Sequence, residues 1–196
     1  MWEGLGYYTR CRNFHTAAKI VFKNFNGIIP NDWKNLTSLP GVGDYTAAAI
    51  LSIAFNKPYA VMDGNAKRVM SRILGIKNLT SWNLSRIDKT LSNIIPEQIP
   101  GDFNQSIMEL GATLCIPRNP SCNKCPLFFG CKAFKTNKPD SYPKPAVKKI
   151  KPHYTIVIGI IWRENKFFIQ RRSEQSMLGL SLIHISEPTR PERIGV

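Results

Sequence analysis

Four of the five cysteines lie within residues 115–131, and their spacing constrains the fold of that segment more than any other feature of the sequence. Cys115, Cys122, Cys125 and Cys131 follow the pattern C-x6-C-x2-C-x5-C. Four thiolates this close in sequence can surround one inorganic core, which is either a structural zinc ion or an iron–sulfur cluster. The spacing is consistent with both, and Pro126 after the third cysteine is compatible with a 4Fe–4S cluster.

The compartment expected for this chain also favours a metal centre over disulfides. No apolar run approaches the roughly 18 residues that a membrane span requires. Met1 is followed by residues 2–4 (WEG), which are unlike a secretory signal. We therefore expect a cytoplasmic chain without a membrane partner, in which clustered cysteines bind metal. Cys11 stands alone and is interpreted as an ordinary helical residue.

The charge balance points to a polyanionic partner. The chain has 27 Lys and Arg residues against 13 Asp and Glu, which gives a net charge of +14. Nucleic acid is the commonest partner of so basic a protein. An anionic membrane surface is the other candidate, but the sequence has no long basic amphipathic helix that could bind there.

Residues 1–134 are predicted to be helical and to form one domain. Apolar residues recur at helical spacing over approximately residues 10–25, 44–55, 65–74, 83–95 and 102–115. Glycine- and proline-containing turns separate these segments. Ser81 and Asp102 are the expected N-caps of the last two helices.

The character of the sequence changes after residue 134. Residues 135–152 are rich in lysine and proline, and we interpret them as a basic linker that either contacts phosphate or is simply solvated. Residues 153–162 and 166–171 are expected to be strands of a β-hairpin that opens a second domain, incomplete over residues 153–179. Residues 180–190 (LSLIHISEPTR) resemble a translated sequencing-library adapter, so we expect residues 180–196 to be an artefact.

A glycine-rich turn between two predicted helices is a candidate phosphate site. In residues 39–47 (LPGVGDYTA), Gly41, Val42 and Gly43 can form a tight hairpin whose amides face outward. The next helix begins there and adds its positive N-terminal end. This arrangement binds a backbone phosphate without reading the base sequence.

Asp63 is the candidate catalytic carboxylate. It precedes Gly64 and Asn65 at the start of a predicted helix. An acid in this position is often only an N-cap, and this interpretation remains open. Since the residue follows a phosphate-binding hairpin, it could also lie beside a sugar held by its own phosphate.

The hairpin, the aspartate and the four cysteines occur together in this order, and this combination resembles the helix-hairpin-helix base-excision DNA glycosylases with a 4Fe–4S cluster. Within that superfamily the chain resembles the MutY-type adenine DNA glycosylases. The resemblance rests on residues 2–8 (WEGLGYY), on the hairpin with Tyr45, and on residues 62–65 (MDGN). It implies that the cysteines hold a 4Fe–4S cluster and that the strands from Tyr154 begin a Nudix-like α+β domain.

The resemblance also implies a reaction and a site. It implies removal of adenine opposite 8-oxoguanine or guanine in double-stranded DNA, by a monomer in the bacterial cytoplasm that associates with the nucleoid. Asp63 would stabilise or capture the sugar cation, supported by Asn65 and Tyr45. The closest alternative is the endonuclease III type, which places a lysine where this chain has Tyr45, because strand nicking needs an amine.

The implied DNA contacts come from three places in the sequence. Tyr7 would wedge into the duplex beside the damaged pair, while the hairpin would hold the backbone phosphate. Lys67 lies one helical turn after Asp63, and we interpret it as a phosphate contact rather than a catalytic group. Arg118, Lys124 and Lys132 surround the cysteines and would also face phosphate.

The sequence departs from the family pattern at both ends. The family's general acid is a glutamate on an earlier helix, and Glu3 is not that residue. We therefore expect a chain truncated at both ends, with slow or no turnover of its own. The alternative to an enzyme is a DNA-binding fragment that has no catalytic activity.

Overall fold

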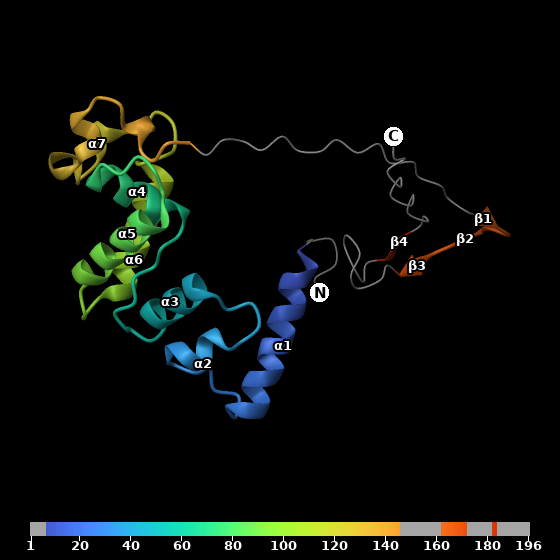
Figure 1. Cartoon of the computed structure of the whole chain (residues 1–196). Helices are drawn as coiled ribbons and strands as arrows, with labels where there is room; N and C mark the ends of the chain where they lie inside the picture. Colours follow the sequence, from blue (N-terminus) through green and yellow to red (C-terminus); the bar gives the residue numbers. More distant parts are fainter. Residues whose placement is uncertain (1–6, 146–161, 172–181, 184–196) are drawn as a thin grey trace, which may run out of the picture. The chain divides into compact units, whose positions relative to one another are not determined.

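The computed structural model describes residues 7–145, 162–171 and 182–183. The chain divides into two compact units, Met1–Val147 and Lys148–Val196. The described part of the first unit is helical, as predicted (Figure 1). Its helices are α1 (Tyr8–Asn24), α2 (Trp33–Thr37), α3 (Asp44–Ile53), α4 (Gly64–Leu74), α5 (Ser81–Ile94), α6 (Pro100–Thr113) and α7 (Lys132–Lys135). Among the described residues, no helix is both long enough and apolar enough to cross a membrane.

Among the described residues before position 115, α2 is the one α-helix that the apolar pattern does not predict, because its five residues are too few to show a period. A local N-cap defines it instead. The backbone N–H of Asn35 donates to Asp32 Oδ1 over 3.0 Å, and the Asn35 side-chain amide donates to Oδ2 over 2.8 Å. These hydrogen bonds, the backbone one foremost, lower the pKa of Asp32.

Two predicted N-caps are wrong by one or a few residues. The cap of α5 is Thr80, whose hydroxyl accepts from the backbone N–H of Asn83, and Ser81 is the first helical residue. Helix α6 begins at Pro100, because proline is preorganised for the first helical position. Asp102 therefore lies in the first turn of α6, where its negative charge still favours the helix N-terminus.

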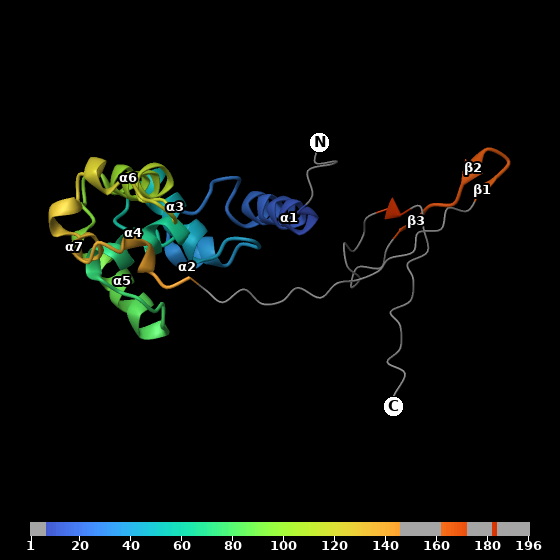
Figure 2. The same ribbon diagram turned by 90° about the horizontal axis from the view of Figure 1, so that it is seen from above.

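The described part of the first unit contains two hydrophobic clusters. One is formed by α2 and α3 and includes the buried side chains Leu36, Leu39, Ala47 and Leu51, with α1 residues packed against it. The other is formed mainly by α4 and α5 and includes Met70, Ile76, Ile87 and Leu91. Figures 1 and 2 show α1–α3 at one end of the unit and α4–α7 at the other.

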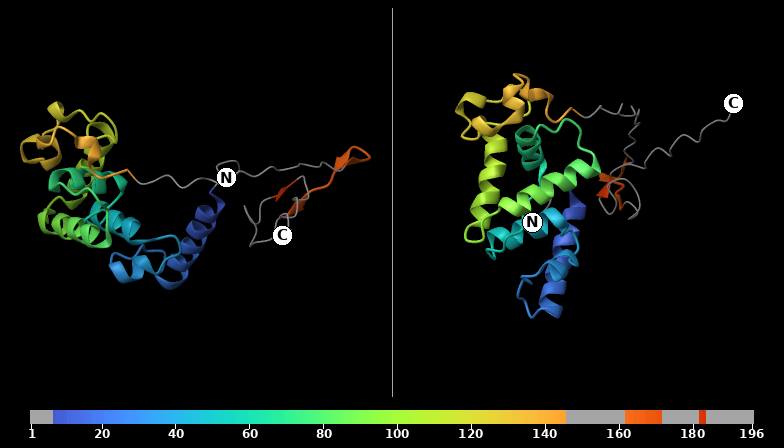
Figure 3. Two further views of the ribbon diagram at one scale, coloured as in Figure 1. Left: turned by 45° about the horizontal axis from the view of Figure 1, so that its top comes forward. Right: turned by 60° about the vertical axis from the view of Figure 1, so that its left-hand side comes forward.

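Helix α6 connects the two ends, because both α3 and α4 pack against it (Figure 3). Gly101 permits the contact with α3: a Cβ there would lie only 3.0 Å from the carbonyl oxygen of Ser52. Asn104, which is 2% exposed, secures the segment that leads to α4. Its Oδ1 accepts from the N–H of Val61, and its Nδ2 donates to the carbonyl of Tyr59.

The helical unit extends beyond residue 134, where the basic linker was expected to begin. The 3₁₀ turn η3 (Pro139–Ser141) follows α7, and Tyr142 is buried. The N–H of Lys144 donates to the carbonyl of Lys77 over 2.6 Å. These contacts attach the first half of the expected linker to the domain, and residues 146–152 lie outside the described part.

The described part of the second unit contains four short strands. Strand β1 (Trp162–Arg163) pairs antiparallel with β2 (Lys166–Phe167), through a turn at Glu164 and Asn165 with positive φ at both residues. Strand β3 (Gln170–Arg171) pairs antiparallel with β4 (Leu182–Ile183). The predicted hairpin is present at β1 and β2, but its expected second strand does not continue through residue 171, because Gln170 and Arg171 pair with β4 instead. Residues 153–161, 172–181 and 184–196 lie outside the described residues, so the Nudix-like domain and the adapter origin stay predictions.

Candidate DNA-binding and catalytic site

The glycine-rich turn forms the connection between α2 and α3. Gly41 has a φ of +83°, and the N–H of Val42 donates to the carbonyl of Leu39 over 3.1 Å. Gly43 is the extended N-cap of α3. In the described part of the chain, no acceptor pairs with the amides of Gly41 and Gly43, which are both exposed. The turn therefore offers free amide donors beside the N-terminus of α3.

The same turn packs against α1. A Cβ added to Gly41 would lie 2.9 Å from Cβ of Asn13. Glycine is therefore required at this position both for its backbone conformation and for the close approach of α1.

Asp63 is the N-cap of α4, with extended backbone angles. Its Oδ1 accepts from the backbone N–H of Ala66 over 2.6 Å. Within the described residues, no hydrogen bond occupies the second carboxylate oxygen. The capping bond thus orients a half-buried carboxylate and leaves one oxygen available for a ligand.

Asn65 lies in the first turn of α4, where an arginine fixes its side chain. Arg68 Nη2 donates to Asn65 Oδ1 over 2.8 Å and to the carbonyl of Gly111 over 2.6 Å. Arg68 Nε donates to the carbonyl of Cys115 over 2.8 Å. Burial, followed by the charge of Arg72, lowers the pKa of Arg68. The first turn of α4 is therefore connected by hydrogen bonds to the end of α6.

Three other predicted residues lie apart from this network. Tyr45 is in the first turn of α3 and is half exposed, and in the described structure no hydrogen bond joins it to Asp63 or Asn65. Lys67 is partly buried on α4. Tyr7 precedes α1 with a positive φ and is 84% exposed.

The four clustered cysteines line one small cavity, together with Leu114, Phe128, Phe134 and Arg72. The cluster loop, which we define as residues 115–131, contains the 3₁₀ turns η1 (Cys122–Lys124) and η2 (Phe128–Gly130). Burial, followed by the neighbouring cysteines, raises the pKa of the thiols of Cys122 and Cys125. Folding therefore brings together all four predicted ligands.

Within the described residues, no group of three or more His, Cys, Asp or Glu side chains is arranged to hold a single metal ion. A single zinc ion needs its thiolates about 2.3 Å from one point. A cluster of four irons spreads its four thiolates over different iron atoms, so the sulfur atoms can lie farther apart. Four thiols that line one cavity are a donor set that a 4Fe–4S cluster can use.

Arg72 is buried beside these cysteines, with 2% of its surface exposed. Its guanidinium donates to Cys115 Sγ over 3.2 Å and to four backbone carbonyls between 2.8 and 3.1 Å away. The carbonyls belong to Tyr142 and to the start of the cluster loop: Cys115, Ile116 and Pro117. One side chain therefore links α4, the cluster loop and the segment after α7.

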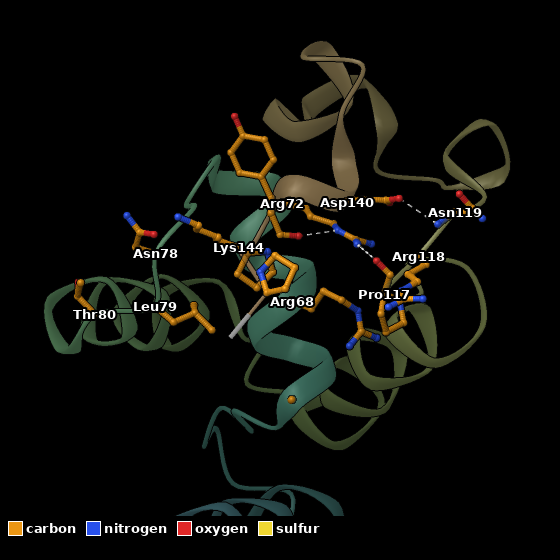
Figure 4. Close-up of a pocket in the computed structure, with 14 residues that line it drawn as sticks. Arg68, Arg72, Asn78, Leu79, Thr80, Pro117, Arg118, Asn119, Asp140 and Lys144 are labelled. Carbon is orange, nitrogen blue, oxygen red and sulfur yellow. Dashed lines mark hydrogen bonds between the residues drawn. The ribbon is translucent and has the colours of Figure 1, made fainter. Parts of the chain in front are cut away.

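A larger pocket lies along α4 (Figure 4). Gly64, the residue after Asp63, is one of the residues that line it. Its charged lining residues are Arg68, Arg72, Arg118, Lys144 and Asp140. Figure 4 shows Arg72 bonded to the Pro117 carbonyl and Asp140 bonded to Asn119. The pocket has an excess of positive charge, which attracts a polyanion.

Sequence reasoning missed Arg68, Arg72, Asn104 and Gly111. The signal for Arg72 is its place in the helical pattern, since it falls three residues after Val69 on the buried face of α4. A buried arginine must have several acceptors, but the pattern does not show which ones.

Comparison with known proteins identifies this arrangement. A family described as helix-hairpin-helix motif matches residues 24–53, which include α2, the hairpin and α3. The adenine DNA glycosylase of Buchnera aphidicola subsp. Acyrthosiphon pisum is 40% identical over 181 residues, covering 90% of this chain and 51% of that protein. The adenine DNA glycosylase of Homo sapiens is 42% identical over 142 residues, covering 68% of this chain and 25% of that protein.

The chain belongs to the adenine DNA glycosylase family. It spans about half the length of its Buchnera relatives in that family. Solved glycosylase structures share its fold. A thermostable thymine-DNA glycosylase matches with a TM-score of 0.59 at 30% identity, covering 64% of this chain and 58% of that one. A non-covalent endonuclease III–DNA complex matches with a TM-score of 0.58 at 30% identity, covering 68% and 61%.

Proposed function

We propose that this chain supplies the catalytic carboxylate and the DNA-binding hairpin of a base-excision enzyme that removes adenine opposite 8-oxoguanine or guanine. The observation that carries the proposal is the geometry of Asp63. One carboxylate oxygen is held by the Ala66 amide, and the other is free of hydrogen bonds in the described structure. A fixed negative charge of this kind stabilises the sugar cation that forms as a base leaves.

Asn65 and Tyr45 support the reaction in different ways. Asn65 is held by Arg68 and can keep the first turn of α4 in place while charge develops beside Asp63. Tyr45 is exposed at the start of α3, on the side of the hairpin. Its phenol can donate a hydrogen bond, but it has no amine to form a Schiff base. This difference favours simple glycosidic hydrolysis over the strand nicking of the endonuclease III type.

Double-stranded DNA would be bound through its backbone. The free amides of Gly41 and Gly43 and the N-terminus of α3 suit a phosphate. Lys67 and Arg118 add positive charge beside α4. The exposed Tyr7 ring is available to wedge between bases beside the mispair. The target adenine must leave the stack, and this costs less energy at a mispair. One copy of the chain supplies all these contacts, so we propose a monomer, located in the bacterial cytoplasm.

The donor set around the cysteine cavity fits a 4Fe–4S cluster. Cys115, Cys122, Cys125 and Cys131 would hold it, and the Arg72 guanidinium lies against the first sulfur. The cluster would supply a rigid, ligand-bound core to a loop that has little hydrophobic core of its own. In this proposal, the cluster loop braces Arg118, Lys124 and Lys132 toward DNA.

The departing adenine also needs a proton. General acid catalysis is worth roughly a hundredfold to ten-thousandfold in rate. Protons from the solvent can also protonate the leaving adenine, so the release of adenine by this chain should accelerate as the pH falls.

Single-turnover base release tests the proposal. The substrate is a duplex with adenine opposite 8-oxoguanine, and the chain is in excess. Release should be abolished in Asp63→Asn, which keeps a side-chain oxygen to cap α4 but removes the charge. The matched control, Asp88→Asn, changes an exposed acid on α5 and should release adenine at the parent rate. Strand nicking without alkali, or full activity in Asp63→Asn, would contradict the proposal.

A further inference from the structure

Helices α4 and α6 make a very close contact at Asn65 and Gly111. Gly111 is buried, and a Cβ built on it would lie 2.6 Å from Cβ of Asn65 and 3.2 Å from its Cα. Real side chains do not approach this closely, so any residue larger than glycine must push Asn65 or α6 away. Gly111 lies in the last turn of α6, and glycine within a helix lowers its stability relative to alanine. Glycine at this position therefore makes α6 less stable but allows Asn65 to approach it closely.

Hydrogen bonds hold the same contact from the other side. Arg68 Nη2 bonds both the Gly111 carbonyl and Asn65 Oδ1, at 2.6 Å and 2.8 Å. Asn65 is therefore confined between the backbone of α6 and the guanidinium of Arg68. Asp63 is two residues earlier, and its capping bond to Ala66 belongs to the same helical turn. A shift of Asn65 must consequently move the carboxylate.

We propose that Gly111 is a positioning residue, whose missing side chain sets the place of the Asp63 carboxylate relative to the sugar. The inference rests on the proposed function of Asp63. Adding a methyl group at position 111 would move the first turn of α4 by several tenths of an ångström or more. An error of about 1 Å at a reacting centre can reduce the rate about a hundredfold.

Two DNA probes test the inference without requiring turnover. Both place a base-free sugar analogue opposite 8-oxoguanine. One analogue is a pyrrolidine that carries a positive charge, and the other is a neutral tetrahydrofuran. The parent chain should bind the cationic probe more tightly, because Asp63 faces the charge. In Gly111→Ala this preference should fall about tenfold, while binding of the neutral probe and the iron content stay within twofold.

A matched control is available on the same helix turn. Ala112→Ser adds one atom on the exposed side of α6, and it should keep the parent preference for the cationic probe. A double-variant cycle then assigns the effect to the contact. Asn65→Gly removes the Cβ that Gly111→Ala would strike, so adding Gly111→Ala to Asn65→Gly should cause little further loss.

The possible failures are distinguishable. If the parent chain shows no preference for the cationic probe, the proposed function of Asp63 is wrong. If the parent shows the preference and folded Gly111→Ala retains it, only the role of Gly111 is overturned. If Gly111→Ala does not fold, restoration of folding by Asn65→Gly supports the contact, and failure to restore it overturns the inference.

Discussion

Arg72 donates a hydrogen bond from Nη1 to the sulfur of Cys115 across 3.2 Å. The pair places a buried cation against the first ligand of the proposed cluster. The same guanidinium bonds the backbone of the cluster loop and of Tyr142. Its role is therefore both electrostatic and structural.

Replacing Arg72 should damage the fold as well as the cluster. Arg72→Met fills similar volume but leaves several buried carbonyls without donors, so the free energy of unfolding should fall by about 2–4 kcal/mol. Urea denaturation and iron analysis of the purified protein measure the two effects. Arg86→Met, on the exposed side of α5, is the control and should change stability little. Unchanged stability in Arg72→Met would show that the hydrogen bonds are not needed.

The cluster proposal predicts about four iron atoms per chain after anaerobic purification. Cys122→Ser should lose most of this iron and weaken DNA binding, because the cluster loop loses its rigid core. Cys11→Ser removes the cysteine outside the cluster loop and should keep both properties. Metal analysis by mass spectrometry decides the question, and one zinc ion per chain without iron would rule out the cluster.

Gly41 and Gly27 offer a matched test of the hairpin. Both have a positive φ, of 83° and 80°, so alanine strains the backbone equally at either site. Only at Gly41 would the new Cβ strike Asn13, since Gly27 faces open space. Gly41→Ala should therefore weaken duplex binding about tenfold, while Gly27→Ala changes it little. Fluorescence anisotropy with a labelled duplex measures the difference, and equal losses would argue against the hairpin as the phosphate site.

Asp44 is an exposed acid in the first turn of α3, beside the amides that would hold phosphate. Its charge should repel DNA, so Asp44→Asn should bind a duplex roughly two- to fivefold more tightly at low salt. The gain should vanish as salt rises, because screening weakens a surface charge. Asp88→Asn serves as the control for net charge, and an equal gain there would mean that the position of Asp44 is unimportant.

The pKa of Asp32 predicts a pH dependence for α2. Since folding lowers this pKa from 3.8, the ionised cap stabilises the folded state above that value. The contribution is lost as the pH falls through the lower, folded value. The stability difference between the parent and Asp32→Ala should therefore be present at pH 7 and shrink at about pH 3. Asp32→Asn, which keeps an acceptor but does not titrate, should show a weaker pH dependence in urea unfolding.

The local features of the site were predictable because they depend on neighbouring residues. The turn at Gly41 needs only its own glycines, and Asp63 caps α4 by accepting from an amide three residues later. The four cysteines are close in space because they are close in sequence. A short helix such as α2 escapes this reasoning, because its five residues show no period.

The supports of the site could not be predicted in the same way. Arg72 bonds groups 43 to 70 residues away along the chain, and Arg68 bonds groups 43 and 47 residues away. The contact between Asn65 and Gly111 depends on how two helices cross. Such contacts form only when the whole domain packs, so the sequence around one residue does not indicate which distant residue it will contact.

The position of α6 between the two hydrophobic clusters limits how this domain can move. Gly101 lets α3 rest directly on α6, and Asn104 fastens the chain just ahead of Asp63 to the same helix. These contacts couple the two ends of the described domain through α6. If this coupling holds during binding, a duplex that touches both the hairpin and α4 has to bend to reach them, and the flexibility of the DNA then becomes part of what is recognised.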